Sequence, residues 1–324
     1  MNPGLHFDYT AVGHVTIDVL ADGSRRPGGT AFYSALQAAR LGYRTLIITQ
    51  GLPGEIEELL APYRPEIELQ IQPAAATTTL VTRGSGTGRV QRMLAWAGPM
   101  GKEVTVDSAI LHLAPVARES PQSWRGTCDF VGLTPQGLAR DWSDPHGEVR
   151  VTPTDAASVS IARHCQAVVV SEHERSSCRA LLGEAVAAGA VAVITAGAAP
   201  ATILLDDGRT LELDVPAVED VVDDLGAGDV FAAAFFIALA DGTGAERAAS
   251  LQTLQPPCGC KAPAQPRSAI ERPSPNGSTP FELISSQSAG QYPLELVEAP
   301  APSLVLGIAA PVGRDAAVDH QYRG

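Results

Sequence analysis

The chain has 324 residues, of which 45% are hydrophobic and 5% aromatic, and a formal net charge of -13. This length and composition predict one sizeable globular unit whose core is built from small aliphatic side chains. The acidic balance disfavours nucleic acid and anionic membrane surfaces as partners, because both bind proteins through clustered Lys and Arg.

Other bulk features favour a cytoplasmic protein. No apolar run reaches the ~18 residues that are needed to span a bilayer. Residues 1–9 lack the basic and then apolar pattern of a signal peptide. The 5 cysteines are an odd number without paired metal-ligand spacing, which suits a reducing cytosol.

The N-terminal part of the chain alternates between strand and helix signals. We expect a first strand over 9–19, a helix over 30–40 and a strand over 45–49. Shorter strand-like runs then follow at 66–71, 77–83 and 89–96. A flexible, glycine-rich turn separates the last two runs.

The alternation resumes after Pro99. Expected strands lie at 109–113, 130–133, 167–170, 191–195 and 202–205, and expected helices at 177–188 and 230–240. A loop at 135–137 follows one of these strands, at the end where ligands of open α/β sheets gather. The pattern predicts an α/β fold with a largely parallel sheet.

The most informative stretch is 222–231, where small residues lead directly into a long apolar helix. Gly226, Ala227 and Gly228 leave their backbone N–H groups open to a phosphate or a developing oxyanion at the positive end of the helix dipole. Asp229 lies in the first helical turn, where it could act as a general base for an attacking hydroxyl. The alternative is that Asp229 only caps the helix.

A second glycine pair, Gly28-Gly29, opens the helix expected near the N-terminus and is followed by Leu41-Gly42 at its end. With the Gly-Ala-Gly-Asp turn at 226–229, this pair gives the chain a pattern that resembles the ribokinase-like (PfkB) family of carbohydrate kinases over roughly residues 6–251. The resemblance implies a three-layer ribokinase-like fold. It also implies an ATP-dependent kinase whose base is Asp229 and whose anion hole is formed by 226–228.

Further roles follow from the same resemblance. On the substrate side it implies Gly28, Gly29 and Tyr33, the last of which stands where the family commonly has Asn. The family's Asn-x-x-Glu element, which orders magnesium and phosphate, is similar to 171–174, so Glu174 is the expected ligand of Mg²⁺. The implied nucleotide-side residues are Glu174, Thr195, Gly197 and Asp223.

A small β-lid usually covers the sugar in this family. Only nine residues separate Asp18 from Gly28, so we expect a reduced lid that a partner subunit of a homodimer could complete. Asp18 is suited to accept two sugar hydroxyls, although a solvated turn carboxylate is an equal alternative. His14, His112 and His164 lie in or beside apolar strands and are expected to be structural.

The chain departs from the family after Leu251. Residues 252–324 are rich in Pro, Ser, Gly and Gln without sustained periodicity, which predicts a disordered tail behind a kinase core of 1–251. If 252–272 are written with GC-rich codons of our choice and read one base earlier, an Ala-Asn-Ala-rich peptide appears. That peptide resembles the family's missing segment, which helps to build a monovalent-cation site, and we interpret the tail as a frameshift product.

Two hypotheses therefore remain open. The chain is an ATP-dependent kinase for a small polyol, whether a sugar, a cyclitol or a nucleoside, or it is an inactive relative with a damaged C-terminus that binds nucleotide weakly or not at all. A nicotinamide-dependent oxidoreductase is disfavoured, because its glycine-rich turn should follow the first strand.

Overall fold

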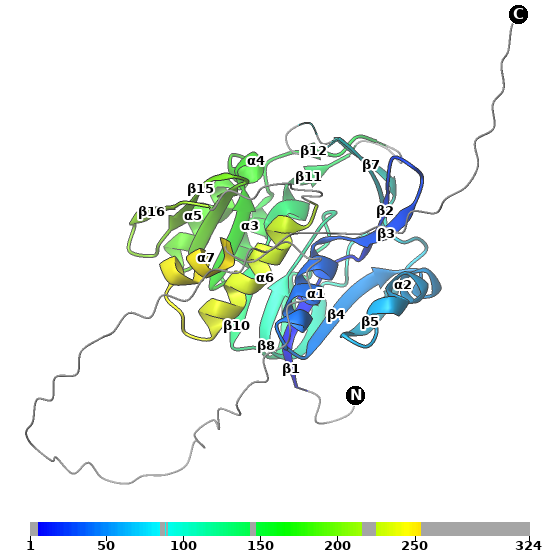
Figure 1. The fold of residues 1–324 in the computed structure, drawn as a ribbon, viewed down its shortest axis with the longest axis horizontal. Helices are drawn as coiled ribbons and strands as arrows, with labels where there is room; N and C mark the ends of the chain where they lie inside the picture. The colour runs from blue at the N-terminus through cyan, green and yellow to red at the C-terminus, as the bar shows by residue number, and fades with distance from the viewer. Residues whose placement is uncertain (1–5, 85–87, 89, 143–146, 216–224, 254–324) are drawn as a thin grey trace, which may run out of the picture. The chain divides into compact units, whose positions relative to one another are not determined.

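The computed structural model describes residues 6–84, 88, 90–142, 147–215 and 225–253 (Figure 1). Asp223 and residues 254–324 of the tail expected over 252–324 lie outside these ranges, whereas 252 and 253, also expected in the tail, are helical. Within the described ranges, no helix is both long and apolar enough to cross a membrane.

A large, mostly parallel sheet forms the centre of the molecule (Figure 1). Its order is β16 (Thr210–Leu213), β15 (Ala199–Leu204), β14 (Val191–Ala196), β13 (Ala167–Ser171), β10 (Phe130–Leu133), β8 (Glu103–Leu113), β1 (Phe7–Val12), β4 (Thr45–Gly51) and β5 (Ile67–Pro73). The pairs from β5 to β14 are parallel, whereas β15 and β16 join as an antiparallel hairpin. β9 (Ser123–Thr127) pairs with the first half of β8. The expected α/β architecture is confirmed.

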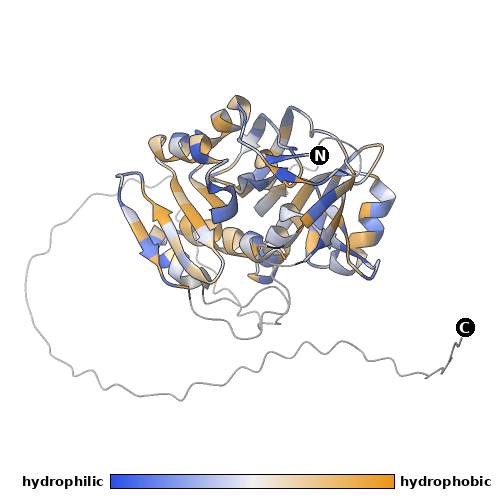
Figure 2. Cartoon of the chain, turned by 90° about the horizontal axis from the view of Figure 1, so that it is seen from above, coloured by the Kyte–Doolittle hydropathy of each residue, from blue (hydrophilic) through white to orange (hydrophobic). Residues whose placement is uncertain are grey.

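Helices cover both faces of the sheet and complete three layers. One core cluster joins the sheet to α1 (Thr30–Arg40), α2 (Pro53–Leu60), α6 (Ala227–Ala240) and α7 (Ala245–Thr253). The other cluster joins it to α3 (Ala156–Ala162) and α5 (Arg179–Ala187). Figure 2 shows that the strands between these layers are mainly hydrophobic, as expected for a sheet that is buried on both sides.

The first strand expected from the sequence is in fact two strands that belong to different sheets. β1 ends at Val12, and β2 (Thr16–Val19) lies in a small second sheet. The chain leaves the main sheet at Gly13, where a Cβ would lie 2.1 Å from the carbonyl oxygen of Ala114. Continuous hydrophobicity concealed this break, because both strands are buried.

The second sheet is the lid, with the order β3 (Arg25–Gly28), β2, β6 (Thr79–Arg83) and β7 (Val90–Ala95). Its strands are only 4 to 6 residues long, in agreement with the reduced lid that we expected. The same chain covers the outer edge of β7, since the N–H of Met93 donates to Gly147 at 2.9 Å and the N–H of Val149 donates to Gln91 at 2.8 Å. Residues 147–149 thus close an edge that a partner subunit could otherwise have paired with.

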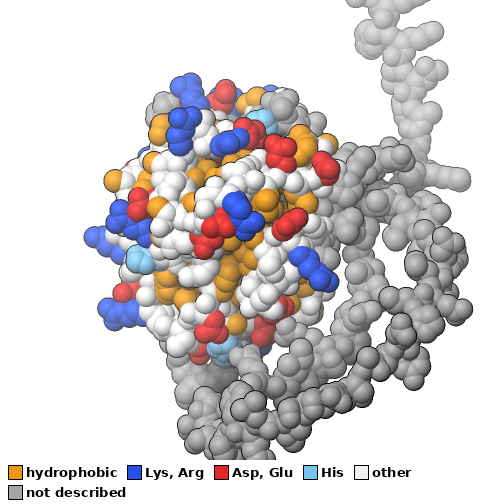
Figure 3. Space-filling model, turned by 90° about the vertical axis from the view of Figure 1, so that its left-hand side faces the viewer, with side chains coloured by type: hydrophobic (Ala, Val, Ile, Leu, Met, Phe, Trp, Pro, Cys, Tyr) orange, Lys and Arg blue, Asp and Glu red, His pale blue; other side chains and the backbone are white. Residues whose placement is uncertain are grey.

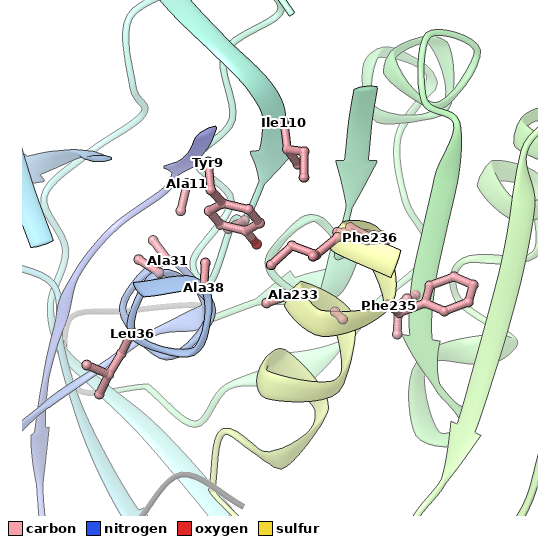
Figure 4. Close-up of a cluster of buried hydrophobic side chains, with 14 of the residues drawn as sticks. Tyr9, Ala11, Ala31, Leu36, Ala38, Ile110, Ala233, Phe235 and Phe236 are labelled. Carbon is pink, nitrogen blue, oxygen red and sulfur yellow. The ribbon is translucent and has the colours of Figure 1, made fainter. Parts of the chain in front are cut away.

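The packing of α1 against α6 brings the two glycine-rich turns together. Tyr9, Phe235 and Phe236 fill the space between these helices and the sheet (Figure 4), and all three are fully buried. A Cβ at Gly132 would lie 2.3 Å from the Phe236 ring, so only glycine lets α6 approach β10 this closely. The starts of α1 and α6 therefore lie next to each other at the carboxyl end of the sheet.

Candidate active site

A pocket of about 520 Å³ opens at the carboxyl ends of the parallel strands, beside the starts of α1 and α6. The structure brings eight of the sequence-predicted site residues to its wall: Asp18, Gly29, Tyr33, Glu174, Thr195, Gly226, Gly228 and Asp229. Gly28, Ala227 and Gly197 do not line the pocket. Asp223 lies outside the described residues.

The glycine turn before α6 has the geometry that an anion site needs. Gly226 adopts the left-handed conformation with φ 83°, and a Cβ there would lie 2.6 Å from the ring of Tyr33. A Cβ at Gly228 would meet no atom within 4 Å, so the space above it belongs to the pocket. The N–H groups of the 14-residue helix α6 therefore begin at an open wall, where they favour negative charge.

Asp229 follows this turn and is held by residues from other elements. Gln136 donates from Nε2 to Asp229 Oδ1 at 3.2 Å and also hydrogen-bonds Thr30. The Thr30 hydroxyl in turn hydrogen-bonds the Asp229 carboxylate. The Asp229 side chain therefore has hydrogen-bond partners outside its own helix, in α1 and in the loop that carries Gln136.

The surroundings of Asp229 raise its pKa to about 7. Desolvation is the main cause, and the negative charges of Glu174 and Asp18 add to it. The hydrogen bond from Thr30 and the positive charge of Arg140 oppose this rise. A carboxylate with a pKa near neutrality is well matched to proton transfer, and this shift was not expected from the sequence pattern around Asp229.

Arg140 and Gln136 are site residues that the sequence analysis missed. Arg140 donates from Nη2 to Gln136 Oε1 at 3.0 Å and from Nη1 to the carbonyl of Val116 at 3.0 Å. The amide of Gln136 is thereby oriented with its nitrogen toward Asp229. The loop at 135–137 was the available signal, because it follows a strand whose carboxyl end faces the pocket.

Asp18 is buried rather than solvated, with an exposed fraction of 3%. Thr16 donates from Oγ1 to Asp18 Oδ1 at 2.8 Å. Gly28 packs against the same carboxylate, because a Cβ there would lie 2.2 Å from Oδ2. The alternative of a solvated turn carboxylate is therefore wrong, and the role of Gly28 is to leave room for Asp18.

The opposite end of the pocket is formed by Ser171, Glu174 and Thr195. Glu174 accepts from the backbone N–H of Ser171 at 3.1 Å and also hydrogen-bonds the Ser171 hydroxyl, which forms a capping box at the start of the short helix α4 (Glu172–Arg175). Thr195 donates from Oγ1 to the carbonyl of Val170 at 3.3 Å. Gly197 forms the tight turn after β14, with φ 63°.

The described residues contain no group of three or more His, Cys, Asp or Glu side chains that could enclose a metal ion. Mg²⁺ commonly binds through one or two carboxylates together with substrate phosphates, so a single carboxylate beside the donor end of the pocket is compatible with it. Glu174 meets that requirement because it lines the pocket and is only half-buried.

A second hollow lies between α5 and the β15–β16 hairpin. It is on the side of the molecule shown in Figure 3, where charged side chains of both signs are interspersed with apolar ones. Two of its arginines are already paired, since Arg175 lies 3.3 Å from Glu172 and Arg209 lies 2.6 Å from Asp207. Its charges are therefore largely balanced, in contrast to the convergent groups around Asp229.

Comparisons with known proteins agree with this geometry. Residues 139–251, the stretch that carries Arg140, Glu174 and Asp229, match the model of the pfkB family carbohydrate kinases. A comparison with curated protein sequences gave no match.

Three solved structures illustrate the likeness in fold. A pyrophosphate-dependent kinase in the ribokinase family, complexed with a pyrophosphate analogue and myo-inositol, has TM-score 0.58 and 19% identity, over 76% of this chain and 92% of that one. Adenosine kinase from Sinorhizobium meliloti has TM-score 0.55 and 15% identity, over 77% and 92%. Arabidopsis thaliana ribokinase complexed with ribose and ATP has TM-score 0.55 and 15% identity, over 77% and 91%.

Proposed function

We propose that the chain, whose residues 139–251 match the model of the pfkB family carbohydrate kinases, is a kinase of this family that transfers a phosphoryl group from ATP to an alcohol group of a small polyol. The acceptor is a sugar, a cyclitol or a nucleoside. The observation that carries the proposal is the position of Asp229, which lies in the first turn of α6, beside the glycine turn and in the same pocket as Asp18.

The reaction follows from the groups around Asp229. Its carboxylate takes the proton of the acceptor hydroxyl while the oxygen bonds to the γ-phosphorus, and the bond from that phosphorus to the bridging oxygen breaks to leave ADP. The N–H groups at 226–228 face the transferring phosphoryl group and stabilise its charge. Because the transition state is loose, positioning supplies most of the acceleration.

Magnesium would be held by Glu174 and by the phosphate oxygens of the donor. When bound, the ion neutralises charge on the β- and γ-phosphates. Arg140 contributes a positive charge to the pocket, and through Gln136 it also orients Asp229. These residues leave Asp229 as the group that accepts the proton.

The acceptor end of the pocket combines polar and apolar surfaces. Asp18 can accept hydrogen bonds from hydroxyl groups, whereas Leu80, Val116 and Val149 provide an apolar wall beneath the lid. A compact ring that carries hydroxyls on one face suits this combination. The solved kinases with this fold include one complexed with myo-inositol and one complexed with ribose, which supports testing both kinds of ring.

An acceptor panel tests the proposal. Purified full-length protein is incubated with Mg²⁺, ATP and single sugars, cyclitols or nucleosides, and donor consumption is measured with and without acceptor. Pyrophosphate is included as a second donor because one solved relative is described as pyrophosphate-dependent. We expect acceptor-dependent consumption of ATP.

Two aspartates, one in the first turn of α6 and one directly after its last residue, provide a matched pair of variants for this assay. Asp229→Asn removes the base, whereas Asp241→Asn changes an aspartate at the far end of the helix. We expect only Asp229→Asn to abolish consumption. Folded protein that consumes neither donor with any acceptor would instead support the inactive relative.

A further inference from the structure

A fully buried carboxylate, that of Glu119, holds the loop that follows β8, although it does not itself line the pocket. Its Oε1 accepts from the backbone N–H of Val116 at 2.8 Å, and its Oε2 accepts from the backbone N–H of Ala117 at 2.5 Å. Oε1 also accepts from the backbone N–H of His14 at 2.8 Å, where the chain passes from β1 to the lid. One side chain thus ties this loop to the crossover between the two sheets.

Peptide groups, rather than an ion pair with His14, stabilise the buried Glu119 side chain. His14 Nδ1 lies 3.9 Å from Glu119 Oε2 and hydrogen-bonds the hydroxyl of Thr78 at 2.8 Å. Burial lowers the pKa of His14 and the charge of Glu119 opposes this only in part, so the imidazole is neutral near pH 7. The three N–H groups must therefore stay close to the Glu119 oxygens, because a buried acceptor of this kind is costly to leave unpaired.

The peptide group between Val116 and Ala117 lies between Glu119 and Arg140. A trans peptide group is planar, so its N–H and its C=O point in opposite directions. The N–H, that of Ala117, points at Glu119 Oε2, and the C=O, that of Val116, accepts from Arg140 Nη1 at 3.0 Å. The Glu119 carboxylate thereby sets the direction of the carbonyl that holds the Arg140 guanidinium.

Arg140 passes this constraint on to Asp229. Its guanidinium group is planar with donors in fixed directions, so a bond from Nη1 also decides where Nη2 points. Nη2 donates to Gln136 Oε1 at 3.0 Å, and Gln136 Nε2 donates to Asp229 Oδ1 at 3.2 Å. A continuous series of hydrogen bonds therefore leads from Glu119 to the carboxylate in the first turn of α6.

The backbone provides a second connection between the same two loops. The N–H of Gly137 donates to the carbonyl of Pro115 at 3.1 Å, and the N–H of Arg118 donates to the carbonyl of Gly137 at 3.0 Å. A Cβ at Gly137 would lie 2.5 Å from the backbone nitrogen of Val116, so the loops are in direct contact. Arg118 is held at φ 65°, in the left-handed region that favours glycine, which indicates a tightly constrained loop.

We propose that Glu119 is a positioning residue that acts through Arg140 to keep Asp229 in its reactive orientation. The role of Asp229 as a base rests on the function proposed above, whereas the hydrogen bonds that lead to it do not. Without the Glu119 carboxylate, the buried N–H groups lose their acceptor and the 116–117 peptide group is free to turn. Arg140 then loses the carbonyl that holds it beside Gln136.

The titration of Asp229, followed by the ¹³C shift of its carboxyl group in labelled full-length protein without ligand, tests this link without any substrate. Desolvation raises the pKa of Asp229, and the charge of Arg140 opposes the rise. Displacing Arg140 in Glu119→Gln should therefore move the midpoint of Asp229 to higher pH, by roughly 0.5 pH unit or more. Removal of the Glu119 charge acting through space would move it to lower pH, so the sign distinguishes the two effects.

Two further variants of acidic residues support this measurement. Glu119→Asp keeps the charge but is too short to reach all three N–H groups, so it should move the midpoint of Asp229 in the same direction and serves if Glu119→Gln does not fold. Asp8→Asn is the matched control, because the Asp8 carboxylate also accepts from a backbone N–H, that of Arg44 at 2.9 Å, but near the opposite end of β1. It should leave Asp229 unchanged.

A double variant tests the route. In an Arg140→Met background the charge through which Glu119 acts is gone, so Glu119→Gln should no longer move the midpoint of Asp229 to higher pH. An unchanged midpoint in a folded Glu119 variant, or the same shift with and without Arg140, would overturn the proposal.

Kinetics test the consequence, with myo-inositol, D-ribose and adenosine as acceptors and MgATP as donor. For the acceptor that is phosphorylated, Glu119→Gln should lower kcat by roughly 10-fold or more and move the kcat/KM–pH midpoint to higher pH, while Asp8→Asn does neither. Wild-type kcat and midpoint in folded Glu119→Gln would contradict the positioning role. Absence of turnover by the wild type with every acceptor would count against the proposed function, and the titration of Asp229 would still decide the role of Glu119.

Discussion

Asp229→Asn should stabilise the protein, and by an amount that grows with pH. In the folded protein the pKa of Asp229 is raised from 3.8 to about 7, mainly by desolvation. As pH rises through this interval, the unfolded chain ionises while the folded protein keeps its proton. The folded protein is therefore destabilised as pH rises. The cost is absent below 3.8, where Asp229 is protonated in both states, and it is fully developed above about 7.

The size of the effect follows from the same pKa. At about 1.4 kcal/mol per pKa unit, ionising Asp229 costs the folded state at most roughly 4 kcal/mol at pH 8. Roughly 2 to 3 kcal/mol of this cost develops between pH 5 and pH 8. Both values are upper limits, because the carboxylate is only half-buried and reaches the solvent of the pocket. Asn has no charge to desolvate, so the variant avoids the cost.

Urea unfolding of the wild type and Asp229→Asn at pH 5, 6, 7 and 8 measures this difference. The excess stability of the variant should increase from pH 5 to pH 7 and level off toward pH 8. Asp107→Asn is the matched control, because hydrogen bonds from Thr127 and His6 lower the pKa of exposed Asp107, and its loss should not stabilise the protein at high pH. A stability difference between wild type and Asp229→Asn that is constant with pH would refute the assignment of a raised pKa.

Three further substitutions probe the pocket. Gly228→Val places a side chain in open space above the glycine turn, so activity should fall by ~10²-fold or more while the melting temperature stays near that of Gly183→Val; an active Gly228→Val would argue against an anion hole at this turn. Arg140→Met removes the positive charge that lowers the pKa of Asp229, so the kcat/KM–pH midpoint should move to higher pH, whereas Arg118→Met should leave it in place. Gly28→Ala puts a Cβ 2.2 Å from the Asp18 carboxylate and should raise the acceptor KM, unlike Gly54→Ala, whose Cβ meets nothing within 4 Å; equal KM values would remove Asp18 from acceptor binding.

Local signals in the sequence were sufficient for the elements that carry the glycine turns. The helix expected over 30–40 is α1 with the same bounds, and the turn at 226–229 opens α6 as expected. Both depend on glycines at helix starts followed by small apolar residues, which is information held within a few positions. The same reasoning missed α2 and α3, although Pro53 at the first turn and the side chain of Asp155 mark their starts.

The site itself depends on contacts that no local pattern contains. Gln136 reaches Asp229 across 93 positions of the sequence, and Tyr9 reaches His112 across 103. Tyr9 and His112 meet because β1 and β8 are adjacent strands, and Gln136 meets Asp229 because the loop after β10 and the start of α6 line the same pocket. For the same reason Asp18 could not be distinguished from a solvated carboxylate until the packing of Gly28 against it was known.

The most direct test of the central role given to Asp229 is ³¹P NMR of the reaction products. Wild-type protein, Asp229→Asn and Asp241→Asn are each incubated with MgATP and the best acceptor from the panel, at about pH 8 so that Asp229 is ionised. A new phosphate monoester should form together with ADP in the wild type and in Asp241→Asn, and its rate should fall by ~10²-fold or more in folded Asp229→Asn. Monoester formed at the wild-type rate by Asp229→Asn would contradict the account.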